Sequence, residues 1–114
     1  MEVSWSREGQ VTVIAVEGSI DALTADDFLR SMQAQLAAGD AQLVADLSRV
    51  DYASSAGLSA ILVVLKESRQ EGGDLRLAAV QRGVYRVLSL SGLDSILKIY
   101  GDVEAAVASY DEMG

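Results

Sequence analysis

The chain has 114 residues, a net charge of −8, no cysteine and no histidine, and half of its residues are hydrophobic. This length suits one folded domain, so we expect residues 1–114 to form a single domain with one core. The missing residue types exclude disulfides, thiolate or imidazole metal ligands and catalytic triads of the Ser-His-Asp kind. The acidic charge opposes contact with nucleic acid or anionic membranes, and it favours either solubility or a partner with a basic face.

No membrane-spanning or targeting segment is indicated by the sequence. The chain contains no uncharged apolar run of about 18 residues, which a spanning helix would need. Its first residues, MEVSW, lack the basic and apolar stretches of a signal peptide. We therefore expect a cytoplasmic protein without membrane insertion.

In chain order, the predicted elements begin with a hairpin and then alternate between helix and strand. The first hairpin strand alternates like an edge strand, and the second is apolar on both faces like a central strand. The predicted strands cover residues 3–7, 11–16, 43–45, 75–79 and 96–100. The predicted helices cover residues 25–38, 54–71, 84–90 and 102–110.

Local signals mark the ends of these elements. Thr24 and Asp27 resemble a capping box for the first helix, and Asp102 is expected to cap the last helix. The short third strand is expected to end at Asp46. The third helix is defined by apolar residues at helical spacing, namely Val84, Val87, Leu88 and Leu90.

The element order β-β-α-β-α-β-α-β-α places the chain in the α/β class. It predicts a mixed, mostly parallel β-sheet flanked by helices, with right-handed crossovers. In such sheets, functional residues usually lie beyond the carboxyl ends of the strands. Two segments meet this description, residues 18–21 and residues 46–55.

Several catalytic and cofactor motifs are absent. The sequence has no P-loop, no strand-linked G-x-G-x-x-G and no G-x-S-x-G, so we expect no cofactor. A phosphate-receiving aspartate domain would need more acidic residues than Asp21 and a lysine beyond the last strand, whereas Lys98 lies within that strand. A metal site built from Asp21, Asp46 and Asp51 is chemically possible, but carboxylates that cap turns explain these residues better.

The helix that follows residue 53 has two contrasting faces. Its core side is expected to hold Leu58, Ile61, Leu62, Val64 and Leu65. Its other side carries Ala56, Ser59, Ala60, Val63 and Glu67. This second side is small and weakly apolar where a solvated helix would carry charge. It is therefore either a docking surface or covered by another element of the domain.

Ser54 and Ser55 stand at the start of this helix. Either hydroxyl could accept hydrogen bonds from free backbone N–H groups as an N-cap, worth about 1 kcal/mol. Either could also carry a phosphate, whose charge of about −1.5 to −2 the helix N-terminus would stabilise. The domain would then stay folded, while a partner docked beside the serines would be released by desolvation and repulsion.

Three stretches of the chain carry a family resemblance. They are DLSRVDYASSAGL at residues 46–58, GSIDA at residues 18–22 and LSLSGL at residues 88–93. Together they resemble STAS domains, specifically bacterial anti-sigma factor antagonists. The element order fits as well, so the resemblance covers essentially the whole chain and implies a STAS-like fold.

The resemblance implies a phosphorylation switch. Ser55 is the implied acceptor because it precedes Ala-Gly-Leu, and Ser54, which stands where the family often has aspartate, is the second choice. The unphosphorylated protein would bind an anti-sigma factor that is also a serine kinase, thereby regulating sigma-factor-dependent transcription, and a serine phosphatase would reverse the switch. With the outer helix face, the expected partner-binding residues are Asp21, Asp46, Ser54, Ala56, Gly57, Ser59, Ala60 and Val63.

Two other functions remain open at this point. A STAS scaffold could bind a partner without being phosphorylated, in a signalling complex or a lipid-transport machine. A small enzyme, or a domain that binds a nucleotide or lipid, is less well supported because histidine, cysteine and a phosphate loop are missing. We therefore expect a non-enzymatic binding protein.

Overall fold

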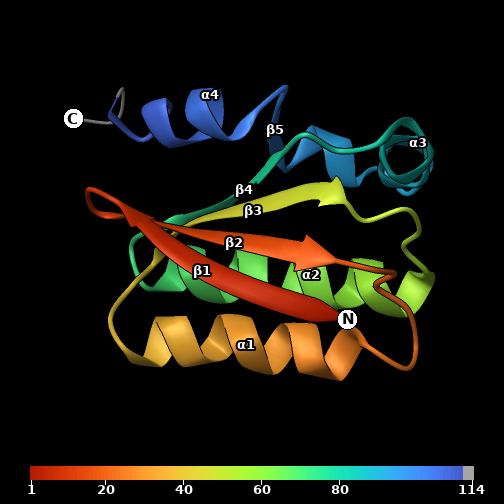
Figure 1. The fold of residues 1–114 in the computed structure, drawn as a ribbon, viewed down its shortest axis with the longest axis horizontal. Coiled ribbons are helices and arrows are strands. Elements are labelled where there is room, and N and C mark those ends of the chain that lie inside the picture. The colour runs from red at the N-terminus through yellow and green to blue at the C-terminus, as the bar shows by residue number, and fades with distance from the viewer. Residues whose placement is uncertain (112–114) are drawn as a thin grey trace.

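The structure is a computed structural model in which residues 1–111 are described (Figure 1). Its strands are β1 (Glu2–Glu8), β2 (Val11–Glu17), β3 (Gln42–Arg49), β4 (Asp74–Ala78) and β5 (Lys98–Tyr100). Its helices are α1 (Ala25–Ala37), α2 (Ser55–Gln70), α3 (Arg82–Leu90) and α4 (Val103–Ala108), with a short 3-10 helix, η1, at Leu93–Ser95. This order confirms the predicted alternation of strands and helices.

The strands form one mixed sheet in the order β1-β2-β3-β4-β5. β1 pairs antiparallel with β2, whereas the pairings of β2 with β3, β3 with β4 and β4 with β5 are parallel. The predicted mixed, mostly parallel sheet is therefore confirmed. Because parallel strands end at the same edge of a sheet, the segments that follow β2 and β3 leave the sheet side by side.

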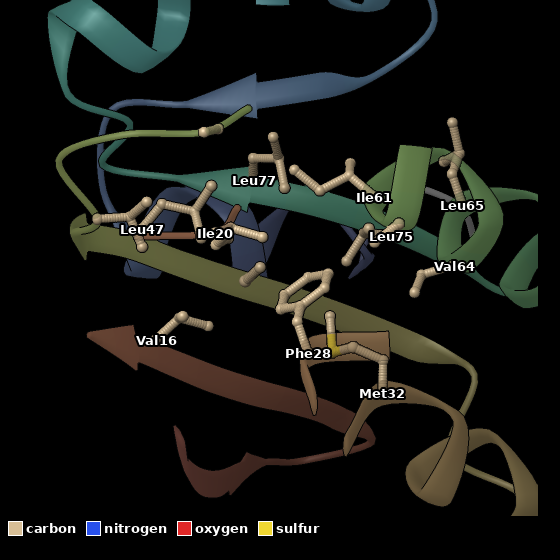
Figure 2. Close-up of a cluster of buried hydrophobic side chains, with 14 of the residues drawn as sticks. Val16, Ile20, Phe28, Met32, Leu47, Ile61, Val64, Leu65, Leu75 and Leu77 are labelled. Carbon is tan, nitrogen blue, oxygen red and sulfur yellow. The ribbon is translucent and has the colours of Figure 1, made fainter. Parts of the chain in front are cut away.

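Helices cover the two faces of the sheet unequally. α1 and α2 pack together against one face, while α4 lies on the other (Figure 1). Figure 2 shows the larger core, where Phe28 and Met32 of α1 and Ile61 and Leu65 of α2 lie against the strands. A smaller core under α4 contains Val11, Val13, Val44, Ala78, Ala106 and Tyr110.

A buried polar network fixes α4 to the sheet. The Arg76 side chain, which is 1% exposed, donates hydrogen bonds to Asp74 Oδ2 at 3.2 Å and to the Ser109 hydroxyl at 2.6 Å. Its guanidinium also lies 4.0 Å from the centre of the Tyr110 ring. The Tyr110 hydroxyl donates to the Leu43 carbonyl at 2.6 Å and accepts from the Leu43 N–H at 3.1 Å.

The predicted capping box at the start of α1 is wrong. Thr24 does occupy the N-cap position, but its side chain makes no capping hydrogen bond. Its hydroxyl instead accepts from the Asp21 N–H at 2.9 Å and donates to the Ser19 carbonyl at 2.7 Å. Asp27 pairs with Arg30 on the exposed side of the helix. The Thr24 hydroxyl is thus bonded to the preceding turn and is not available to cap the helix. The predicted cap of α4 is confirmed, because the Asp102 carboxylate accepts the Ala105 N–H at 2.7 Å.

Most element boundaries differ from the prediction by one or two residues, and the end of β3 differs by more. β3 continues to Arg49 instead of ending at Asp46, because Arg49 still pairs with Glu17 of β2. β5 begins only at Lys98, since the chain before it forms η1. α4 ends at Ala108, before Tyr110.

The predicted apolar stripe of α3 is only partly buried. Val84 and Leu88 lie in the core, whereas Leu90 is 80% exposed. Among the described residues, no helix has the length and apolar character needed to cross a membrane.

Candidate functional site

The segments that follow β2 and β3 continue to pair after the two strands have ended. The Gly18 N–H donates to the Arg49 carbonyl at 3.0 Å, and the Ile20 N–H donates to the Tyr52 carbonyl at 2.9 Å. The Ser54 N–H then donates to the Ile20 carbonyl at 3.0 Å. The two candidate segments of the sequence, residues 18–21 and the end of residues 46–55, therefore form one paired structure.

Two buried side chains hold this paired extension against the core. Ile20 and Ala53 form a parallel bridge and are both buried in the core. The residues beside them, Asp21, Tyr52 and Ser54, are exposed or half-buried. The pairing thus places Asp21 beside the serine pair, as expected from the sequence.

Gly57 brings the first turn of α2 against this extension. A Cβ atom at position 57 would lie only 2.2 Å from the Ile20 carbonyl oxygen, which no side chain could tolerate without movement of the backbone. Gly57 is buried, so the structure gives it a spacing role beneath the surface and no open face for a partner. Its place in the expected partner-binding set is therefore wrong as a surface contact.

The two serines occupy different positions at the start of α2. Ser54 is the N-cap residue: its backbone is extended and its hydroxyl accepts the Gly57 N–H at 3.3 Å. Ser55 is the first residue of the helix, is exposed, and makes no side-chain hydrogen bond within residues 1–111. The first turn of α2 also carries no acidic side chain. The free amides and dipole of this helix end can therefore stabilise an anion on Ser55.

The outer face of α2 is narrower than the sequence indicated. Ser59 and Val63 are exposed and Ala56 is half-buried, as a docking face requires. Ala60 is only 5% exposed and belongs to the core, so its assignment to the outer face is wrong. Leu58 and Leu62, both expected in the core, are only partly buried, although both pack against it. The small Ala60 side chain belongs to the packing of α2 against the core, so the exposed part of the face is limited to Ala56, Ser59 and Val63.

Asp21 organises the turn that leads into α1. Its carboxylate accepts the N–H groups of Leu23 at 2.9 Å and of Thr24 at 3.2 Å. The hydrogen bonding to turn amides that the sequence suggested for Asp21 is thus confirmed. The same turn exposes Leu23, which the sequence analysis missed because a single apolar residue in a loop has no periodic pattern.

Asp46 does not share the surface of the serine pair. It lies two residues after Val44, which packs under α4, so Asp46 faces the side of the sheet opposite α1 and α2. There it lines an open groove of about 260 Å³. The other residues lining this groove are Glu2, Val3, Ser4, Ala15, Val16, Glu17, Ser48 and Arg49.

A metal site formed by the three candidate aspartates is not supported by their surroundings. Within residues 1–111, no group of three or more acidic side chains could hold a metal ion. Asp51 instead accepts the Ser19 hydroxyl at 3.2 Å, and Asp21 and Asp46 accept backbone N–H groups as described above.

Known proteins share both the sequence pattern and the fold. Residues 3–106 match the family model described as the STAS domain. The chain is 32% identical over 110 residues to "Putative anti-sigma factor antagonist BtrV" from Bordetella bronchiseptica, an alignment that covers 96% of this chain and 95% of BtrV. The crystal structure of an anti-sigma factor antagonist from Mycobacterium paratuberculosis is similar with a TM-score of 0.86 and 27% identity, covering 95% of this chain and 92% of that chain.

The fold is also that of SpoIIAA, an anti-sigma factor antagonist solved in its unphosphorylated form. That structure matches with a TM-score of 0.83 and 17% identity, and 97% of each chain is covered. The match to the family model extends over both paired segments and over α2. The chain therefore belongs to the STAS domain family, where its relatives are named anti-sigma factor antagonists.

Proposed function

We propose that this protein is an anti-sigma factor antagonist controlled by phosphorylation of Ser55. In the unphosphorylated state it binds an anti-sigma factor that is also a serine kinase, and so releases a sigma factor for transcription. Phosphorylation of Ser55 ends this binding, and a serine phosphatase restores it. The names of the relatives support the antagonist role, since 32% identity extends over nearly the whole chain.

The observation that carries the choice of Ser55 is the contrast between the two serines. The Ser54 hydroxyl is engaged with the Gly57 N–H, so its modification would remove the cap of α2. The Ser55 hydroxyl is exposed, and its modification would break no hydrogen bond that the described residues make. Phosphate at Ser55 therefore suits a switch in which the fold stays intact.

A phosphate at this position would change the surface more than the fold. It would add a charge of about −1.5 to −2 at pH 7 beside the exposed face of α2. Ser59 and Val63 continue that face along the helix. A partner packed on it would have to remove water from the dianion, and an acidic contact would also be repelled. Either effect lowers the affinity without any conformational change.

The protein acts in this proposal by binding alone and catalyses no reaction. Its 114 residues form a single domain that works in the cytoplasm, where sigma factors are found. The groove around Asp46 takes no part in the proposed switch, because it lies on the other face of the sheet.

Phosphorylation with mapping of the modified residue tests the proposal. The purified protein is incubated with ATP and each kinase-type anti-sigma factor of its organism, and the phosphate is located by mass spectrometry. We expect phosphate on Ser55, none on the Ser55→Ala variant, and retained labelling of Ser54→Ala, which loses only a cap worth about 1 kcal/mol.

Two outcomes would contradict the switch. Phosphate on Ser54 instead of Ser55 in the wild-type protein would show that the choice of acceptor is wrong. Absence of phosphate with every kinase, together with retained binding to an anti-sigma factor, would instead identify a STAS scaffold that binds without modification.

A further inference from the structure

The turn between β2 and α1 presents the most exposed large apolar side chain among residues 1–111. Leu23 is 89% exposed and follows Ile20, whose backbone pairs with the segment before α2. Exposed leucines are common on protein surfaces and have no meaning by themselves. The rigidity of its turn and its place beside the serine pair distinguish Leu23 from such residues.

Hydrogen bonds fix the backbone on both sides of Leu23. The Asp21 carboxylate accepts the Leu23 N–H at 2.9 Å, and the Asp21 carbonyl accepts the Ala25 N–H at 2.8 Å. The Thr24 hydroxyl ties this turn to the Ser19 carbonyl at 2.7 Å. A side chain presented on such an ordered backbone loses little conformational freedom when a partner buries it, which favours a role as a binding anchor.

Tyr52 supplies a second large apolar surface on the neighbouring segment. Its side chain is 54% exposed, and its carbonyl accepts the Ile20 N–H at 2.9 Å. Ala53 is buried in the core, whereas Tyr52 is exposed and Ser54 is half-buried. Aromatic side chains are enriched among the few residues that dominate the binding energy of an interface.

We propose that Leu23 and Tyr52 are the apolar anchors by which the unphosphorylated protein docks on its anti-sigma factor. The matching surface on that partner is an apolar pocket with a basic rim, because the carboxylates of Asp21 and Asp51 lie next to the two anchors. This inference rests on the proposed function, since it names how the same site holds its partner.

The anchors also explain why a phosphate would be effective at this place. Tyr52 lies two residues before Ser54, the N-cap of α2, and Leu23 lies three residues after Ile20, whose backbone pairs with Tyr52 and Ser54. A dianion on Ser55 would stand at the edge of an apolar contact and would have to give up water as the partner closes over it. The release therefore depends on the anchors as well as on the phosphate.

Alanine substitutions at the two anchors test the inference. An anti-sigma factor of the source organism that binds the wild-type protein is titrated with the Leu23→Ala and Tyr52→Ala variants by isothermal titration calorimetry. We expect Kd to rise on the order of tenfold or more for each variant. The melting temperature should change by less than about 2 °C, because both side chains are exposed.

Leu90→Ala is the matched control for this experiment. Leu90 is the same residue type, is 80% exposed and lies on α3, so its truncation removes a similar apolar surface elsewhere on the molecule. Its Kd should equal that of the wild-type protein. Leu23→Met keeps a large apolar side chain and should bind within about twofold of the wild-type protein.

The outcomes separate the anchors from the switch. If Leu23→Ala and Tyr52→Ala bind like the wild-type protein while Ser55→Asp is released, the anchors are wrong and the proposed function stands. An equal loss of affinity in Leu90→Ala would also overturn the anchors. If the wild-type protein binds none of the anti-sigma factors of its organism, the proposed function fails, and the anchors fail with it.

Discussion

Ser54 and Ser55 are identical in chemistry and adjacent in sequence, yet their surroundings differ. The N-cap position turns the Ser54 hydroxyl toward the Gly57 N–H, whereas the next position directs Ser55 into solvent. This difference follows from helix geometry, because only the N-cap residue has an extended backbone that lets its side chain reach the free amides. One step along the chain thus separates a structural hydroxyl from an available one.

Asp21 offers a prediction at the same scale, because its charge and its turn hydrogen bonds can be separated. Asparagine keeps an oxygen that can accept the Leu23 N–H, whereas alanine removes both the acceptor and the charge. We expect Asp21→Asn to bind the anti-sigma factor within about threefold of the wild-type protein and Asp21→Ala to lose on the order of tenfold. Calorimetric titration measures both variants. Equal losses would mean that the turn hydrogen bonds contribute nothing to binding beyond the charge of Asp21.

Among the elements, α4 is the one whose attachment depends most on polar contacts. It has six residues, too few to be stable alone, and only Ala106 of them is fully buried. Arg76 beneath it contacts Asp74, Ser109 and Tyr110. Two contributions therefore hold α4 on the sheet. Apolar surface is buried beneath it, and the buried Arg76 guanidinium finds its partners there.

Arg76→Ala tests this attachment. The substitution leaves Asp74 buried with Arg69 as its remaining salt-bridge partner. We expect the free energy of unfolding to fall by about 3 kcal/mol, the lower end for breaking a buried pair. Urea denaturation measures this change. Arg86→Ala, an exposed arginine on α3, serves as the control and should change the free energy by less than about 0.5 kcal/mol. Equal stability of the two variants would refute the role of the network.

The sequence predicted most elements because their apolar residues repeat with a clear period. Strands β2 and β4 and helices α1 and α2 follow from such patterns. The buried network could not be predicted, since Arg76 in a strand gives the same pattern as an outward-facing charge. Ala60 could not be placed either, because a small residue suits a close core contact as well as an open face.

The candidate site was predicted in part. The proximity of Asp21 to the serine pair followed from the carboxyl ends of parallel strands, and the pairing of Ile20 with Tyr52 and Ser54 confirms it. That Asp46 lies on a different face from the serine pair could not be predicted, because the sequence pattern places the end of β3 too early. Because β3 continues to Arg49, Asp46 takes a strand direction that turns it to the other face.

Over the whole molecule, the sheet separates two surfaces, although the sequence predicts that Asp46 and the serine pair share one partner-binding site. One face carries α1 and α2 and leads to the serine pair, and the other carries α4 and the groove around Asp46 (Figure 1). Tyr110 ties the second face together through its hydrogen bonds to Leu43 in β3 and to the Asp74 carbonyl in β4. The stability of the whole fold should therefore depend on the protonation of this phenol.

Burial, with a contribution from Asp74, raises the pKa of the Tyr110 phenol. In the unfolded chain the phenol loses its proton near pH 10, whereas the folded protein keeps it to higher pH. The unfolded state then binds fewer protons, so stability is complete below about pH 10 and falls as the pH rises above that value.

Tyr110→Phe provides the comparison. The variant should be less stable at pH 8 by about 1 to 3 kcal/mol, because the buried groups of Leu43 lose their partner. Between about pH 9.5 and 11 its stability should decline less steeply than that of the wild-type protein. Urea titrations at several pH values measure the two slopes. If the stabilities of the two proteins decline in parallel with pH, Tyr110 does not cause the loss of stability at alkaline pH.

The place of Ser55 in the first turn of α2 has a consequence for any enzyme that modifies it. Such an enzyme meets the serine on a helix whose cap, Ser54, and whose contact with Ile20 through Gly57 hold the turn closed. A short peptide of the same sequence would lack the Ile20 segment and would not keep this shape. The substrate of such an enzyme would be a folded surface assembled from two distant parts of the chain, so unfolding the protein would prevent its recognition.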